Sequence, residues 1–136
     1  MASENKSYKG KTILLADDDI DFLEQHAMAL KNMGFEVLEA ESQGDAEKLI
    51  ESEKYDIALF DLMMEAEDSG FILAYKSRKK NPDAPIIIAT SVSNETGMKF
   101  DAATEESRQW IKADVILDKN LRLEQLERAI NALLPV

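Results

Sequence analysis

The chain has 136 residues, of which 45% are hydrophobic, and this length predicts one domain with a core of its own. It contains no cysteine and a single histidine, His26, which excludes disulfides, thiolate metal sites and sites built from several histidines. The net charge of -11 argues against direct binding of nucleic acid, because the phosphate backbone requires a basic surface.

The first eleven residues are polar and contain no signal-peptide core. They predict a flexible leader at 1–11, followed by the domain at 12–136. No apolar run approaches the ~20 residues that a membrane span needs. We therefore expect a cytoplasmic protein that does not bind a membrane.

Five short apolar runs alternate with helical patterns along the domain. The runs are 12–16, 35–40, 57–60, 85–90 and 115–117. Apolar residues at helical spacing predict helices at about 20–33, 43–52, 70–80 and 121–134. The first, third and fourth runs are continuously apolar, which is typical of strands covered on both faces. The second alternates in part and the fifth is short, which favours the edges of a sheet.

This alternation predicts an α/β fold with a five-stranded parallel sheet and helices on both faces. Right-handed crossovers and the two expected edge strands favour the doubly wound, flavodoxin-like order 2-1-3-4-5. In that order the chain changes direction between the first and third strands. Open α/β sheets bind ligands at such a point, outside the carboxyl ends of the strands.

Polar side chains follow four of the five strands at that edge. They are Asp17, Asp18 and Asp19 after the first strand, Asp61 after the third, Thr90 at the end of the fourth, and Lys119 just beyond the fifth. A helix cap explains one of the first three acids, most simply Asp19. The repulsion among the remaining acids requires a cation. We place His26 on the first helix, at the surface and outside this crevice.

The residue types at this edge suit phosphoryl transfer. A site made of oxygen ligands that keeps several waters suits Mg²⁺, and phosphoryl transfer needs a positioned acceptor, a metal and further cations. Asp61 can accept the group as an aspartyl phosphate, and the Thr90 hydroxyl and Lys119 ammonium can bind phosphoryl oxygens. The predicted metal ligands are Asp18, Asp61, Asp17 through a water molecule, and the backbone carbonyl of Met63.

On these residues the sequence resembles a response-regulator receiver domain of two-component signalling, over essentially residues 12–134. The acidic pair after the first strand, Asp61, Thr90 followed by the small Ser91, and Lys119 all match the motif of that family. The resemblance implies that a histidine kinase or a phosphotransfer protein donates the phosphoryl group to Asp61 with Mg²⁺. It implies a domain that catalyses only its own phosphorylation and dephosphorylation. A change in its fourth helix, fifth strand and fifth helix then selects a downstream protein partner.

Three departures from the family lie near the expected site. Glu65 and Asn120 stand where the family usually has prolines, and Gly70 follows the acceptor one residue later than usual. None of the three replaces a residue that the chemistry needs.

Two further departures concern the output of the domain. Ile116 replaces an aromatic residue that commonly moves inward on activation, and the segment 91–114 is longer than usual. We therefore expect Thr90 to act through this segment rather than through Ile116, with Phe100 and Trp110 as apolar anchors.

Three other functions compete with this one. A flavodoxin-like flavin protein would need a phosphate-binding first loop, which three aspartates would repel. A haloacid-dehalogenase-type phosphatase expects a second aspartate two residues after the first, where Met63 stands. A receiver-like protein-interaction module that works without phosphorylation stays open, although no acid, hydroxyl or lysine is lost. Whether the chain is a stand-alone receiver or a part of a larger regulator also stays open.

Overall fold

The computed structural model describes residues 8–66, 68–90, 113–119 and 122–135. The strands are β1 (Thr12–Ala16), β2 (Glu36–Ala40), β3 (Ile57–Asp61), β4 (Ile86–Thr90) and β5 (Val115–Asp118). The helices are α1 (Ile20–Asn32), α2 (Gln43–Ser52), α3 (Ser69–Lys80) and α5 (Leu123–Leu133). The elements thus lie within one or two residues of the predicted ranges. None of these helices has both the length and the apolar character that crossing a membrane requires.

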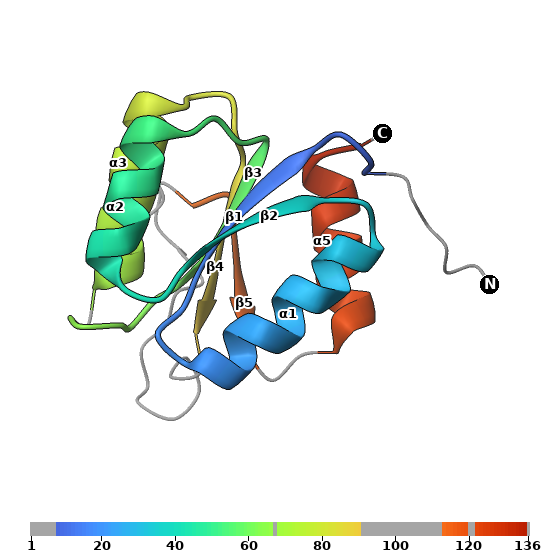
Figure 1. Ribbon diagram of the computed structural model, residues 1–136, viewed down its shortest axis with the longest axis horizontal. Coiled ribbons are helices and arrows are strands. Elements are labelled where there is room, and N and C mark those ends of the chain that lie inside the picture. The colour runs from blue at the N-terminus through green and yellow to red at the C-terminus, as the bar shows by residue number, and fades with distance from the viewer. Residues whose placement is uncertain (1–7, 67, 91–112, 120–121, 136) are drawn as a thin grey trace, which may run out of the picture.

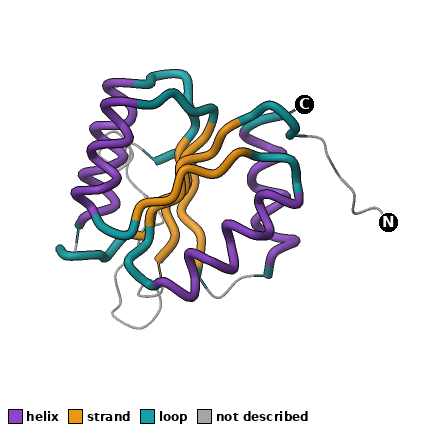
Figure 2. The backbone as a smooth tube through the Cα atoms, in the orientation of Figure 1, coloured by secondary structure: helices purple, strands orange, loops and turns teal. Residues whose placement is uncertain are grey.

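The strands form one parallel sheet in the order β2-β1-β3-β4-β5. Helices α1 and α5 cover one face, and α2 and α3 cover the other (Figures 1 and 2). The predicted fold class and strand order are therefore confirmed.

Each face of the sheet has its own hydrophobic core. Alternate residues of β1 belong to different cores: Ile13 and Leu15 pack toward α1 and α5, and Leu14 and Ala16 toward α2 and α3. All five residues of β3 and all five of β4 are buried. Because both faces of these strands are covered, their sequences show no polar alternation.

The segment before β1 contributes to the core. Tyr8 is 1% exposed and stacks on Phe35, with ring centroids 4.6 Å apart. Its hydroxyl bonds to the side chain of Asn131, and its backbone N–H donates to the Met33 carbonyl at 3.1 Å. We therefore propose that the folded domain already includes Tyr8, rather than starting at residue 12. Residues 1–7 of the expected leader lie outside the described part of the chain.

Gly34 allows this segment to pack against the turn between α1 and β2. Its φ is 110°, and a Cβ atom there would lie 2.6 Å from the backbone nitrogen of Lys9. Only glycine adopts that backbone without strain and leaves room for the neighbouring chain. The turn also explains why α1 ends at Asn32 and β2 begins at Glu36, within one residue of the predicted ends.

Candidate functional site

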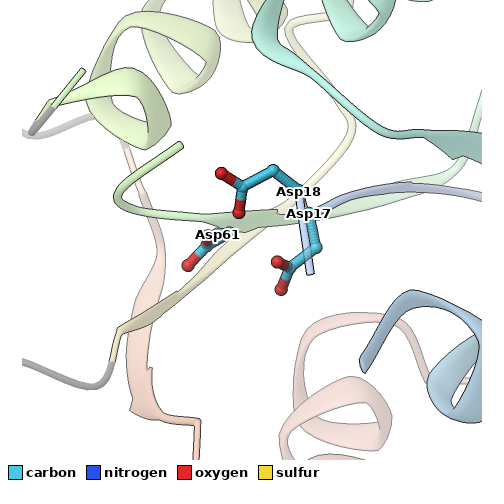
Figure 3. Close-up of side chains that lie close together, drawn as sticks. All are labelled: Asp17, Asp18 and Asp61. Atoms are coloured by element: carbon cyan, nitrogen blue, oxygen red, sulfur yellow. The ribbon is translucent and has the colours of Figure 1, made fainter. Parts of the chain in front are cut away.

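Three carboxylates meet at the carboxyl edge of the sheet, between β1 and β3 (Figure 3). Asp17 and Asp18 follow β1, and Asp61 is the last residue of β3. Each offers a carboxylate oxygen, and these oxygens lie within 4.8 Å of one another. Asp17 is 0% exposed and Asp61 5% exposed, whereas Asp18 lies at the surface. The predicted convergence of the three acids is present in the structure.

The turn from β1 into α1 gives its three consecutive aspartates different surroundings. Asp19 caps α1, and its side chain accepts hydrogen bonds from the backbone N–H groups of Asp21 and Phe22. Oδ1 of Asp17 accepts the backbone N–H of Asp19 at 2.9 Å, which fixes its carboxylate toward the interior. The expected cap at Asp19 is confirmed, and Asp17 and Asp18 remain for the site.

Lys119 reaches the acids from beyond β5. Its backbone N–H donates to the Thr90 carbonyl at 3.0 Å, which fixes the start of its side chain beside β4. Its Nζ lies 3.0 Å from Oδ2 of Asp17 and 3.5 Å from Oδ1 of Asp61. Thr90 is 1% exposed at the end of β4. The four predicted strand ends therefore meet at one edge.

The three carboxylates repel one another, and the pKa of Asp61 reflects this. Unit charges about 5 Å apart repel by about 3 kcal/mol at an effective dielectric constant of about 20. Burial, and then the charge of Asp17, raise the pKa of Asp61 to about 7, although Lys119 opposes the rise. Burial alone lowers the pKa of Lys119, but its hydrogen bond to Asp17 and the charge of Asp61 outweigh burial and raise that pKa.

This site is suited to a divalent cation. Oδ2 of Asp17 is buried, and the Lys119 ammonium lies 3.0 Å from it as an ion-pair partner. Three acids against this one ammonium leave excess negative charge among the described residues. Carboxylate oxygens are the ligands that hard divalent cations prefer. The arrangement therefore fits a metal site, which would also relieve the repulsion.

The loop after β3 accommodates the late glycine. The backbone N–H of Gly70 donates to the Leu62 carbonyl at 2.7 Å. A Cβ atom at Gly70 would lie 2.7 Å from the Asp61 carbonyl oxygen, so the loop can return against the end of β3 only with glycine there. Glu65, where the family usually has proline, accepts the backbone N–H of Gln43 at 3.0 Å and joins this loop to the start of α2.

Two predicted residues of this region have described positions but untested roles. Met63 is 40% exposed in the loop directly after β3, and coordination by its carbonyl stays a prediction. Ile116 is half-buried on β5 and packs against the core under α2 and α3. Four residues discussed from the sequence lie outside the described part of the chain: Ser91, Phe100, Trp110 and Asn120.

The sequence did not identify the contact between α1 and Lys119. The Phe22 ring lies under Lys119, with Nζ 4.5 Å from its centroid, and His26 stacks on Phe22 at 3.8 Å. His26 is partly exposed on α1 and lines a hollow that it shares with Lys119 but with none of the three acids, so its expected place outside the acidic crevice is not contradicted. The four-residue spacing of Phe22 and His26 could have indicated that the two rings stack on one helix, but not that Phe22 contacts Lys119.

Comparisons with known proteins agree with this geometry. The family model for the response regulator receiver domain matches residues 13–131. The phosphate regulon transcriptional regulatory protein PhoB of Pseudomonas aeruginosa is 39% identical over 88 residues, which are 63% of this chain and 38% of PhoB. The chain thus spans well under half the length of that relative.

Two solved structures have the same fold. The response regulator TrrA of Thermotoga maritima, in complex with Mg²⁺ and BeF, matches with a TM-score of 0.72 and 27% identity, over 91% of this chain and 99% of that one. A response regulator from Burkholderia pseudomallei with a phosphorylated aspartic acid and a calcium ion matches with a TM-score of 0.71 and 27% identity. That match covers 90% of this chain and 68% of the other.

Proposed function

The chain belongs to the response-regulator receiver family, and we propose on this premise that Asp61 accepts a phosphoryl group from a histidine kinase or a phosphotransfer protein. The observation that carries the proposal is the position of Asp61. It ends the central strand, is 5% exposed, and lies between two other carboxylates and the Lys119 ammonium. An acceptor needs this combination of a fixed oxygen and nearby cation sites.

The transfer step follows from these positions. A carboxylate oxygen of Asp61 attacks the phosphorus, an O–P bond forms, and the P–N bond to the donor's histidine breaks, so that the imidazole leaves with the bond electrons. The Lys119 ammonium and the Thr90 hydroxyl bind oxygens of the transferred group. Both groups stabilise the negative charge of these oxygens, which the donor's imidazole no longer balances once the P–N bond breaks.

We propose Mg²⁺ as the metal, held by Asp18, Asp61, Asp17 through a water molecule, and the Met63 carbonyl. When bound, the ion supplies positive charge beside both the acceptor and the phosphoryl oxygens. Without a cation, burial and the charge of Asp17 raise the pKa of Asp61 and so favour its protonated form. A cation beside it favours the ionised carboxylate, which is the nucleophile. Metal binding and readiness to accept the group are therefore coupled.

The phosphorylated domain would then bind a downstream protein partner in the cytoplasm. TrrA bound to Mg²⁺ and BeF, and the Burkholderia regulator with its phosphorylated aspartic acid, support the phosphorylation step that would precede this binding. A role for Phe100 and Trp110 in the output stays a prediction, since both lie outside the described residues.

Acetyl phosphate tests the proposal without knowledge of the natural donor. Incubation with this small phosphodonor and Mg²⁺ should add one phosphoryl group, labile to hydroxylamine, to the wild-type protein. Asp61→Asn removes the nucleophile and should abolish the addition. Intact-mass spectra measure both results.

Asp56→Asn is the matched control, because Asp56 precedes the same strand whose end is Asp61. This variant should be labelled like the wild type. Equal labelling of wild type and Asp61→Asn would reject Asp61 as the acceptor. A wild type that takes no label, and whose melting temperature ignores Mg²⁺, would favour an interaction module that works without phosphorylation.

A further inference from the structure

The Lys119 ammonium has an uncharged neighbour as well as two charged ones. Asp17 and Asp61 lie on its acidic side, at 3.0 and 3.5 Å. The Phe22 ring centroid lies 4.5 Å from the same nitrogen. An ammonium over an aromatic face at this distance is attracted by the negative charge density of the ring. The ring comes from α1, so this helix contacts the lysine directly.

The Phe22 ring is itself held in place. His26, one helical turn later, stacks on it with centroids 3.8 Å apart and an interplanar angle of 15°. Nδ1 of His26 lies 3.0 Å from the Phe22 carbonyl oxygen, and since a carbonyl can only accept, that nitrogen donates. Leu117 and Leu126 line the hollow beside the two rings. The lysine side chain is only 15% exposed above them.

We propose that Phe22 is a positioning residue for Lys119, and that its ring face keeps the ammonium over the acidic pocket whatever the charge of the carboxylates. The consequence for phosphorylation rests on the proposed function, whereas the positioning itself does not.

The physical reason is that the two kinds of neighbour respond differently to a bound cation. A divalent ion among Asp17, Asp18 and Asp61 neutralises their charge and repels the ammonium, so the ion pairs weaken when the site is loaded. The attraction of the ring depends on its quadrupole and does not change. Phe22 therefore keeps Lys119 at the site in the state that reacts, when the acids hold it least.

The first test reads the position of Lys119 in the unphosphorylated protein. The Phe22 ring current should shift the Lys119 Hε signals upfield in NMR spectra, and saturating Mg²⁺ should leave most of that shift in place. Phe22→Leu should move the signals to the values of an exposed lysine such as Lys48, while Phe22→Tyr should retain the shift. Unshifted Lys119 signals in the wild type, or a shift that Phe22→Leu leaves unchanged, would overturn the proposal.

The second test separates ring electrostatics from packing. Replacing Phe22 with phenylalanines bearing one, two and three fluorines weakens the π face in steps while the shape is nearly kept. We expect the rate constant for phosphorylation by acetyl phosphate to fall with each step. Phe22→Leu should lower it about two- to thirty-fold, and the dissociation constant of Mg²⁺ should change less than twofold, because the three acids are all retained.

The same fluorinated residues at Phe35 are the control, since that ring stacks on Tyr8 at the opposite end of the sheet. They should leave the rate unchanged. A rate that is flat across the Phe22 series would overturn the inference and leave Asp61 as the acceptor. A wild type that is not phosphorylated would instead reject the proposed function, and the NMR test would still decide whether Phe22 positions Lys119.

Discussion

Aspartates flank strands at both ends of the sheet, and their surroundings at the two ends are opposite. At the amino end, Asp56 precedes β3 and accepts the backbone N–H of Thr12 at 2.8 Å. Asp114 precedes β5, accepts the backbone N–H of Ile86 at 2.8 Å and pairs with Arg78 at 2.6 Å. Each of these two carboxylates has a donor of its own.

At the carboxyl end, Asp17, Asp18 and Asp61 face one another, and the Lys119 ammonium pairs with Asp17 and Asp61. The difference follows from the direction of the strands. The first residues of β1 and β4 donate their backbone N–H groups to aspartates, whereas the last residues of the strands offer carbonyl groups, which cannot donate to a carboxylate. A carboxylate is therefore stabilising at the start of a strand, but at the end it needs a cation.

The largest effect should come from adding that cation. If Mg²⁺ binds the folded chain and not the unfolded one, at a hundred times its dissociation constant it should stabilise the fold by about 2.7 kcal/mol. Asp18→Asn should weaken this response, and Asp56→Asn should leave it intact because Asp56 lies at the other end. Urea unfolding with and without Mg²⁺ measures the difference. If Mg²⁺ stabilised the two variants equally, the acids at the carboxyl end would not differ from Asp56 in binding the ion, and the comparison would be wrong.

Removing an acid at the amino end should destabilise the fold. Asp114→Ala leaves the Ile86 N–H without its side-chain acceptor, which costs about 1–3 kcal/mol. The exposed pair with Arg78 adds little. Asp114→Asn is the control, because it removes the charge of the pair with Arg78 but keeps an oxygen that can accept the Ile86 N–H, and it should cost under about 1 kcal/mol. An Asp114→Ala protein as stable as the wild type in urea would show that this acid does not stabilise the start of the strand.

The smallest effect should appear in the pH dependence of the metal-free protein. The pKa of Asp61 is raised from 3.8 to about 7 in the fold, so folding favours its protonated form. That contribution is fully present below the unfolded pKa and is lost as the pH rises through about 7. Asp61→Asn should therefore gain stability over the wild type as the pH rises from 3.8 to about 7, and should keep that gain at higher pH.

Unfolding curves at a series of pH values, with a chelator present, measure this margin. Asp56→Asn should show no such gain, since Asp56 accepts a backbone hydrogen bond. If the free energy of unfolding changed with pH in the same way for Asp61→Asn and the wild type, ionising Asp61 in the folded protein would cost no free energy, and the prediction would fail.

The carboxyl end could be predicted from the sequence because its signals are local. Continuous apolar runs indicate buried strands, and a polar residue directly after each run indicates the edge that it reaches. The order of the strands then followed from general rules of connection. Asp17, Asp61 and Lys119 could therefore be assigned to one crevice without coordinates.

The other features depend on contacts between distant parts of the chain. Tyr8 is one aromatic residue in a polar stretch, and only its stacking on Phe35 places it in the core. Asp56 and Asp114 look like ordinary loop acids until the register gives each a backbone donor. The position of Phe22 under Lys119 depends on how α1 packs beside β5, which helical spacing does not determine.

The central claim is that Asp61 alone among the three acids accepts the phosphoryl group. Borohydride reduces an acyl phosphate on aspartate to homoserine, and peptide mass spectrometry then identifies the position. After incubation with acetyl phosphate and Mg²⁺, we expect homoserine at position 61 and unmodified aspartate at Asp17 and Asp18. Homoserine at either of those two positions, or unmodified Asp61 in protein that has gained a phosphoryl group, would contradict the claim.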